Sequence, residues 1–136
     1  MTICIIDSSV ILTSLLNLKP TSEKKFKNIL QQQKKGSTEV YSTSFLSLEI
    51  ANGLRFTIKD STLAKEVFDK FSALPIQYFS LNASQIKEIL EISYELQTTV
   101  YDTSYHFLAQ LLDGTFYTCD EKYYQKAKAL GKIEFL

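Results

Sequence analysis

Short apolar runs alternate with longer stretches that carry apolar residues at helical spacing. Residues 2–6 form the first run, and their branched side chains are typical of a buried strand, because a stiff side chain packs well on a pleated surface. Similar runs predict further strands, with a brief extended segment at 98–101, and they lie at residues 39–43, 76–79, 115–118 and 133–136.

Helical spacing fills the segments between these runs. The helices are predicted at residues 10–16, from 21 or 22 to 35, and at 45–56, 61–73, 82–97, 102–112 and 121–130. We expect Pro20 to end the first helix, Thr21 or Ser22 to cap the second and Ser44 to cap the third.

Two of these helices have predicted inner faces that matter for the site. The first stripe comprises Phe45, Leu48, Ala51, Asn52 and Phe56. The second comprises Ile86, Ile89, Leu90, Ser93 and Leu96. Since strands alternate with helices throughout and no linker or repeat interrupts them, we predict one α/β domain, residues 1–136, built on a mainly parallel sheet.

Composition narrows the class of protein. The 136 residues include 15 basic and 15 acidic side chains, so bulk positive charge does not recruit a partner, although a local patch can. No apolar stretch approaches membrane-spanning length and no secretory signal follows Met1, so we expect a soluble cytoplasmic protein. Cys4, Cys119 and one histidine are too few ligands for a structural zinc site, and we expect both thiols to stay reduced.

Four acids share one sequence context. Asp7, Glu49, Asp102 and Asp120 each lie at or just beyond a predicted strand or extended segment, within the first turns of a helix. In a parallel α/β sheet such positions meet at the carboxyl edge, where ligands bind. A simpler interpretation remains open, because acids at helix N-termini also serve as caps and complement the helix dipole.

Converging carboxylates would repel one another unless cations neutralised them. Carboxylate oxygens without thiolates or imidazoles select hard cations, so the predicted metal is Mg²⁺ or Mn²⁺. Such ions activate water and stabilise the charge that develops on a phosphodiester during in-line displacement. Metal-assisted phosphodiester hydrolysis is therefore the reaction class that the residues favour.

The same acids lie in four segments that resemble, in order, the signature blocks of PIN domains, and most closely those of VapC-type toxin ribonucleases. These segments are Ile5-Ile6-Asp7-Ser8-Ser9-Val10-Ile11, Phe45-Leu46-Ser47-Leu48-Glu49-Ile50-Ala51-Asn52-Gly53-Leu54-Arg55, Tyr101-Asp102-Thr103-Ser104-Tyr105-His106-Phe107-Leu108-Ala109 and Tyr117-Thr118-Cys119-Asp120-Glu121-Lys122. The resemblance spans almost the whole chain. Tyr94 and Gln97 depart from it, because the family often has alanine and glycine at these positions.

The resemblance implies a compact sheet with helices on both faces and a Mg²⁺- or Mn²⁺-dependent endoribonuclease. It casts Asp7, Glu49, Asp102 and Asp120 as the acidic metal-binding set. Ser9 and Thr118 match the hydroxyl positions of the family beside the first and last acids, where they orient a carboxylate or water. It further implies an RNA substrate, a cognate antitoxin and a homodimer.

Other interpretations remain at this stage. A non-catalytic PIN-like RNA-binding or scaffold module would keep the acids, and an RNA-maturation nuclease would share the chemistry. A haloacid-dehalogenase-type phosphatase needs an acid where Ser9 stands, and a receiver domain needs an acidic pair that Asp7 lacks. Arg55 is a candidate RNA contact, while His106 and the lysines after Asp120 are equally explained as packing and solvated residues.

Overall fold

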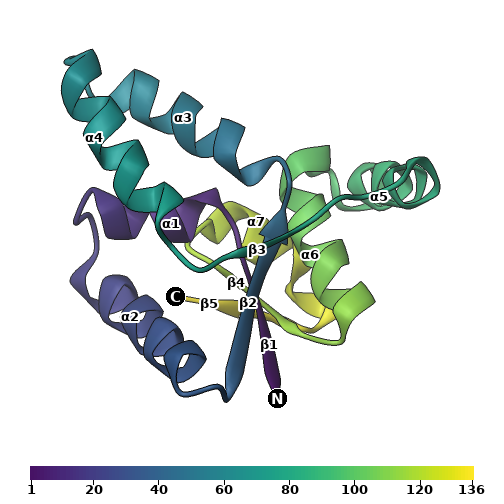
Figure 1. Cartoon of the computed structure of the whole chain (residues 1–136). Coiled ribbons are helices and arrows are strands. Elements are labelled where there is room, and N and C mark those ends of the chain that lie inside the picture. Colours follow the sequence, from purple (N-terminus) through teal and green to yellow (C-terminus); the bar gives the residue numbers. More distant parts are fainter.

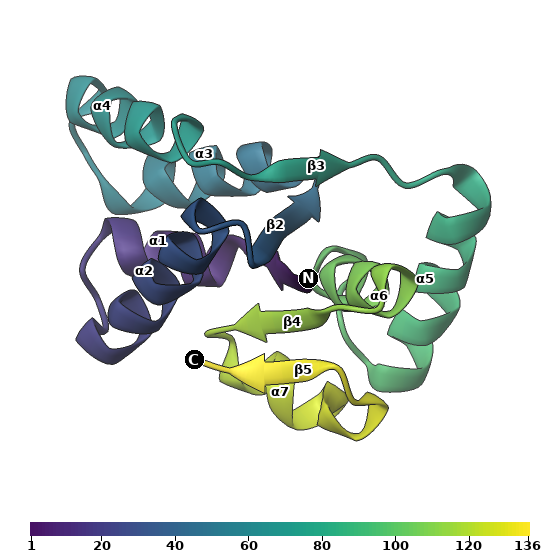
Figure 2. The ribbon, with the colours of Figure 1, turned by 60° about the horizontal axis from the view of Figure 1, so that its bottom comes forward.

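A five-stranded, fully parallel sheet forms the centre of the protein in the computed structural model, which describes all 136 residues. Its strands are β1 (Thr2–Ile6), β2 (Thr38–Thr43), β3 (Gln77–Phe79), β4 (Thr115–Thr118) and β5 (Ile133–Phe135). Their order is β3-β2-β1-β4-β5, with β3 and β2 on one side of β1 and β4 and β5 on the other (Figures 1 and 2). The predicted parallel α/β class is confirmed.

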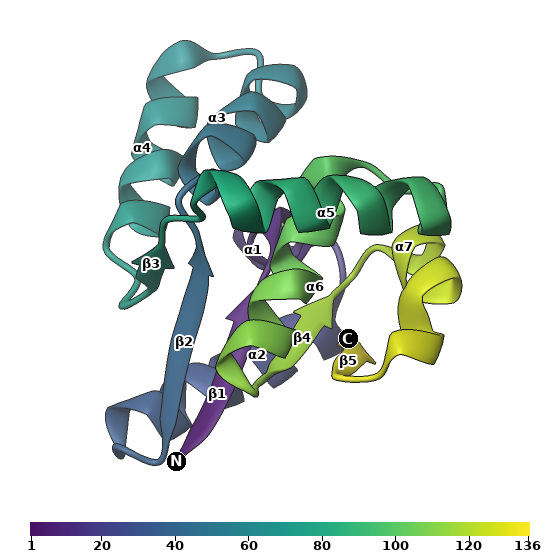
Figure 3. The ribbon, with the colours of Figure 1, turned by 90° about the vertical axis from the view of Figure 1, so that its right-hand side faces the viewer.

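Helices cover both faces of this sheet. They are α1 (Ser8–Leu15), α2 (Pro20–Lys34), α3 (Leu46–Thr57), α4 (Ser61–Ser72), α5 (Ala83–Leu96), α6 (Val100–Leu112) and α7 (Glu121–Ala127), followed by a 3-10 turn, η1 (Lys128–Leu130). Helices α1 and α2 cover one face, and α6 covers the other with α5 outside it (Figure 3). Helices α3 and α4 pack together beyond the carboxyl end of β2 and contact α1 (Figure 1).

The core is densest around the central strand. Ile5 and Ile6 of β1 have no exposed surface, because helices cover both faces of this strand. Phe116 of the neighbouring strand β4 is equally buried and stacks against the ring of Tyr105, at 6.1 Å between ring centroids. Cys4 is buried without a disulfide partner and Cys119 is also unpaired, as expected for two reduced thiols.

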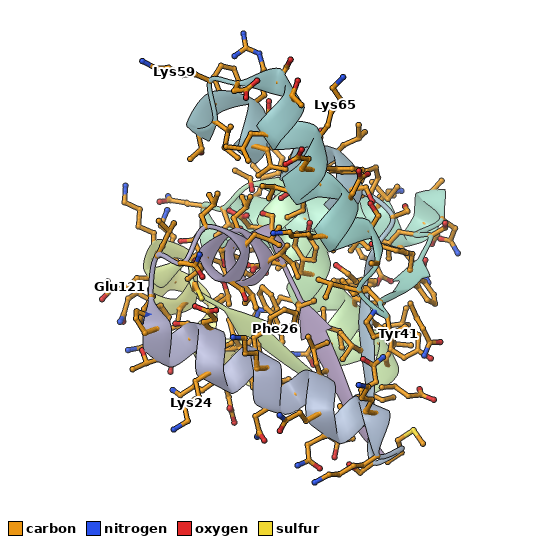
Figure 4. The ribbon with its side chains drawn as sticks, turned by 60° about the vertical axis from the view of Figure 1, so that its left-hand side comes forward. Lys24, Phe26, Tyr41, Lys59, Lys65 and Glu121 are labelled. Carbon is orange, nitrogen blue, oxygen red and sulfur yellow. The ribbon has the colours of Figure 1, made fainter.

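Helix α2 begins one residue earlier than predicted. Pro20 is its first residue and Lys19 its N-cap, so neither Thr21 nor Ser22 caps it. Proline suits this position because its fixed φ is helical and its missing N–H would have had no partner there. Phe26 faces the sheet and Lys24 points into solvent (Figure 4), so the predicted amphipathic character of this helix is correct.

The predicted inner stripe of α3 is wrong. The structure buries Leu46, Ile50 and Leu54, whereas Leu48 and Phe56 are 75% and 78% exposed. Contact with α1 decides this orientation: at Gly53 an added Cβ would lie 2.5 Å from Leu12 Cδ1. Ser44 does not cap the helix either, because Phe45 is the N-cap residue and makes no side-chain capping bond. Two apolar stripes compete in this segment, and the tertiary contact selects one.

The prediction for α5 is correct for the helix and only partly for its inner face. Ile89 and Ser93 are buried, but Ile86 and Leu90 are exposed. The helix ends at Gln97, and the extended segment predicted at 98–101 shrinks because Thr99 already caps α6, which begins at Val100. The third acid therefore follows a tight helix–helix turn rather than a strand.

This turn makes Gln97 a position where glycine is expected to stabilise the fold. Gln97 adopts a left-handed conformation with φ of 56°, which costs about 1 kcal/mol for a residue with a Cβ. We expect Gln97→Gly to raise the free energy of unfolding by about 0.5–1 kcal/mol, measured by urea denaturation. A matched Gln→Gly change at Gln31, inside α2, should instead lower it by a similar amount. Destabilisation by Gln97→Gly would contradict the prediction.

Candidate active site

Two neighbouring strands deliver the first and last acids to the same edge of the sheet. Strand β1 pairs with β4, and Ile6 lies opposite Tyr117 at the carboxyl end of the pair. Asp7 follows β1 directly, and Asp120 follows β4 after one residue. Each acid also caps a helix: Asp7 accepts from Val10 N at 3.1 Å and Asp120 accepts from Tyr123 N at 3.0 Å. The capping interpretation is thus confirmed for Asp7 and Asp120.

Asp7 is a buried carboxylate held by two hydroxyls. It is only 5% exposed. Ser9 Oγ donates to its Oδ1 at 2.6 Å, and Thr118 Oγ1 donates to its Oδ2 at 2.6 Å. The two hydroxyls predicted from the sequence therefore touch the first acid, one on each oxygen.

Ser9 and Thr118 also tie the two strand ends together. Ser9 Oγ accepts from Cys119 N at 2.8 Å, and Thr118 Oγ1 accepts from Asp120 N at 3.0 Å. The two hydroxyl oxygens are 3.2 Å apart, but the only proton of each is used on Asp7, so this contact is not a further hydrogen bond. The network fixes the carboxylate plane of Asp7 relative to Asp120.

Glu49 reaches the site from the first turn of α3. Ser8 Oγ donates to its Oε2 at 2.8 Å, across 41 residues of sequence. Its second oxygen, Oε1, is buried without a hydrogen-bond partner. A buried carboxylate oxygen without a partner is costly, and the neighbouring Tyr105 hydroxyl, itself unpartnered, a water or a ligand can satisfy it.

Asp102 lies in the first turn of α6, where its backbone N–H donates to the hydroxyl of the capping residue Thr99 at 3.1 Å. Asp102 and Asp120 both line a hollow of about 410 Å³. The structure thus places all four predicted acids around one end of the sheet, on α1, α3, α6 and α7 or at their caps.

Burial raises the proton affinity of three of the acids, and the charge of a neighbouring acid adds to the effect in each case. Burial raises the pKa of Asp7 to about 6, and the charge of Asp102 adds to this while the bonds from Ser9, Thr118 and Val10 oppose it. Burial, with the charge of Asp102, also raises the pKa of Glu49. Burial, with the charge of Asp120, raises the pKa of Asp102. Asp102 is therefore electrostatically coupled to the other three acids.

This donor set fits a hard divalent cation. It consists of carboxylate oxygens, it includes the unpartnered Glu49 Oε1, and its mutual repulsion would be relieved by positive charge. No three of these side chains converge closely enough to form a compact metal-binding cluster in this structure.

Sequence reasoning missed one residue of this site. Ser8 anchors Glu49, and its only signal was its position directly after Asp7. Tyr105 is fully buried next to the site, where burial and then the charges of Glu49 and Asp7 raise its pKa, so it remains neutral.

Two further candidates lie outside the group of acids. His106 is buried, with Nε2 donating to Gly131 O at 2.7 Å and Nδ1 accepting from the Tyr123 hydroxyl at 2.9 Å. Burial lowers the pKa of His106, so it is a neutral packing residue. Arg55 lines a separate groove between α3 and α4, and an RNA contact by it stays a prediction.

Solved structures with the same architecture come from toxin–antitoxin systems. VapBC2 from Rickettsia felis, bound to a DNA fragment from its promoter, matches 99% of this chain and 98% of its own, with TM-score 0.71 and 12% identity. A toxin–antitoxin complex from Klebsiella pneumoniae matches 96% and 95%, with TM-score 0.69 and 8% identity. VapBC-1 from nontypeable Haemophilus influenzae matches 99% and 97%, with TM-score 0.61 and 10% identity.

Sequence comparison gives no such match, because neither a protein-family model nor a curated protein is similar enough to this chain. The similarity is therefore one of fold. It extends over nearly the full length of this chain and of the chain it is compared with. The resemblance predicted from the four sequence segments is confirmed at the level of fold: the chain has a PIN-like fold, which it shares with the VapBC structures.

Proposed function

We propose that this protein is a Mg²⁺- or Mn²⁺-dependent endoribonuclease and the toxin of a VapBC-type toxin–antitoxin pair, acting in the cytoplasm. The observation that carries the proposal is the set of four acids at one end of the sheet, in which Ser9 and Thr118 hold Asp7 and Ser8 holds Glu49. The fold of the chain and its toxin–antitoxin neighbours support the same conclusion.

Each side chain has a role in this proposal. Asp7, Asp102 and Asp120 bind the principal cation, while Ser9 and Thr118 keep the carboxylate of Asp7 in one orientation. A cation bound there would supply a lowered pKa to a water molecule and would stabilise charge on the scissile phosphate. Glu49, anchored through Oε2, has Oε1 free to orient the water that attacks phosphorus as the P–O bond to the leaving group breaks.

The neutral net charge of the chain does not argue against RNA. Of its 15 acidic residues, four lie in the site, so 11 acids face 15 basic residues elsewhere. Once cations neutralise the site, the remaining protein is basic and attracts phosphates. Arg55 contributes to this basic excess, and we propose that it contacts RNA.

The direct test is cleavage of a mixed pool of single-stranded RNA by the purified protein. We expect cleavage with Mg²⁺ or Mn²⁺ and none with EDTA. A folded protein that binds RNA but cuts nothing with either ion would favour the alternative, a non-catalytic PIN-like module.

To separate a toxin from an RNA-maturation nuclease, the chain is expressed in cells with and without the gene beside it. Growth arrest that the neighbouring gene relieves supports the toxin.

The proposed antitoxin has a suitable binding surface. A groove of about 590 Å³ runs between α3 and α4, with an apolar floor that includes Leu54, Ile58 and Phe68. Arg55, Lys59 and Lys65 border it, and Lys59 and Lys65 lie at the outer end of these helices (Figure 4). A segment with apolar and acidic side chains would complement this groove and cover Arg55. Loss of antitoxin binding in Phe68→Glu, with RNA cleavage retained, would support this placement.

The proposed homodimer has an apolar surface available on α3, α5 and the start of α6. Exposed side chains of these helices are Phe45, Leu48, Ile86, Leu90, Tyr94 and Tyr101. Phe45, Ile86 and Tyr101 line one shallow pocket, and Leu90 and Tyr94 line a second that shares Val100 with the first, so these five side chains form one patch. Leu48 lies three residues after Phe45, on the same side of α3. Soluble monomers rarely leave such a patch uncovered.

Two substitutions on this patch are expected to give a monomer. Leu48 and Tyr94 are 75% and 79% exposed, so Leu48→Glu and Tyr94→Glu should not disturb the core, but they place charge inside the interface. Light scattering should report a dimer for the wild type and for Leu130→Glu, an exposed control on η1, and a monomer for both variants. A monomeric wild type at micromolar concentration would contradict the proposal.

A further inference from the structure

The hollow beside two of the site acids also contains two lysines. It opens between the end of α5, the start of α6 and α7, which lie side by side in Figure 3. Its lining residues are Gln97, Thr98, Thr99, Asp102, Asp120, Lys122, Tyr123 and Lys126. Lys122 and Lys126 are four residues apart on α7, so both project from the same face of this helix.

Neither lysine is neutralised by an acid. The ion pairs of the chain are Lys27–Glu23 and Lys132–Asp113, so Lys122 and Lys126 form none, although two carboxylates line the same hollow. Lys126 Nζ donates to Gln97 O at 2.7 Å, which holds its ammonium group against the α5–α6 turn and leaves two N–H donors free. Lys122 is exposed and has no hydrogen-bond partner.

The third lysine of this segment behaves differently. Lys128 Nζ donates to Gln125 Oε1 at 2.9 Å and does not line the hollow. If these lysines formed only a solvated basic surface, all three would be expected to have similar surroundings. The structure instead separates two lysines that face the site acids from one that does not.

Charge balance indicates what this hollow binds. With Asp102 and Asp120 neutralised by a cation, the two ammonium groups leave the hollow positive. An ammonium group is a compact point charge that binds phosphate oxygens in many orientations. In an RNA whose scissile phosphate lies at the acids, the nearest other anion is the phosphate of an adjacent nucleotide.

We propose that Lys122 and Lys126 form a phosphate subsite that binds the RNA backbone next to the cleaved bond and directs the strand across α7. This inference rests on the proposed function, because it takes the acids as the cleavage site. The lysines bind and position RNA and do not take part in bond cleavage.

The test measures binding separately from cleavage. The probe is a short fluorescent mixed-sequence 2′-O-methyl oligoribonucleotide, whose integrity during the measurement is checked by gel electrophoresis. Its affinity is measured by anisotropy with Mg²⁺ between roughly 50 and 200 mM salt. We expect Lys122→Gln to weaken binding for all sequences and to reduce the slope of log K against log salt by about 0.7. Lys122→Arg should keep the slope, and Lys128→Gln should leave both quantities unchanged.

Lys126 requires a second comparison, because removing its bond to Gln97 O can disturb the turn before Asp102. Lys126→Arg retains the charge and Lys126→Gln does not, so we expect only the latter to lower the slope.

In cleavage assays Lys122→Gln should raise KM and leave kcat unchanged. If Lys122→Gln keeps the wild-type affinity and slope while the wild type cleaves RNA, the subsite is refuted and the nuclease stands. If the wild type binds the oligonucleotide but never cleaves RNA, and Lys122→Gln lowers the slope, the nuclease fails and the lysines remain an RNA-binding site. A wild type that binds no RNA refutes both.

Discussion

Asp7→Asn is expected to abolish RNA cleavage and, in the metal-free protein at pH 7.5, to stabilise the fold. Asparagine keeps the shape of the side chain and can still accept from Val10 N, but it removes a buried charge. Because the pKa of Asp7 is about 6 in the fold against an ordinary 3.8, its ionised form costs about 3 kcal/mol at this pH. We therefore expect the free energy of unfolding to rise by about that amount, while cleavage falls more than about 100-fold.

The same shift sets the sign of the pH dependence. The folded state binds the Asp7 proton more tightly than the unfolded state does. The contribution of Asp7 to the free energy of unfolding is therefore greatest below pH 4. It decreases as the pH rises from about 4 to 6 and is then constant. Urea denaturation of wild type and Asp7→Asn in EDTA at several pH values measures the difference, which should grow by about 3 kcal/mol across this range.

A matched control is Asp113→Asn. Asp113 is exposed, and its hydrogen bond from Lys132 lowers its pKa, the opposite of the shift at Asp7. This variant should retain cleavage and show no gain in stability. If Asp7→Asn destabilises the metal-free protein at pH 7.5, burial does not dominate the environment of Asp7. If it retains full activity, Asp7 is not part of the site.

Local patterns were sufficient to predict the sheet. Short apolar runs and their following turns identified β1, β2, β3, β4 and β5 to within two residues, because each run is short and ends at a turn. The positions of the first and last acids could also be predicted from the sequence, because the carboxyl ends of neighbouring parallel strands lie at the same edge of the sheet. Asp7 and Asp120 follow β1 and β4, which the structure pairs.

The errors arise where tertiary contacts decide between local alternatives. In α3 the two apolar stripes have similar spacing, and contact of Gly53 with Leu12 turns Ile50 inward and Leu48 outward. The hydrogen bond between Ser8 and Glu49 spans 41 residues, so no local pattern could have indicated it. The sequence likewise could not show that Lys122 and Lys126 share a hollow with Asp102.

Addition of Mg²⁺ or Mn²⁺ is expected to offset most of the stability that the wild-type protein loses as the pH rises. A cation that binds only the folded state stabilises it by about 2.7 kcal/mol at one hundred times its Kd, a rise in Tm of roughly 8 °C for a chain of this size. Binding needs deprotonated carboxylates, and burial holds the pKa of Asp7 at about 6 and raises those of Glu49 and Asp102. The metal-induced rise in Tm should therefore be small at pH 5 and complete by pH 8. At pH 8 the metal-free protein has lost the stability that a protonated Asp7 provides at low pH.

The contribution of the individual acids distinguishes a specific site from general charge screening. Asp102→Asn combined with Asp120→Asn removes two ligands at exposed edges of the site and should abolish the metal-induced rise in Tm at pH 8, whereas Asp113→Asn should retain it. Glu49→Gln should reduce the rise only in part, because Glu49 adjoins the principal ligands and keeps its bond from Ser8. An equal rise in the double variant would assign the metal to the general surface, and the carboxylates would then serve as helix caps alone, as Asp7 and Asp120 do for α1 and α7.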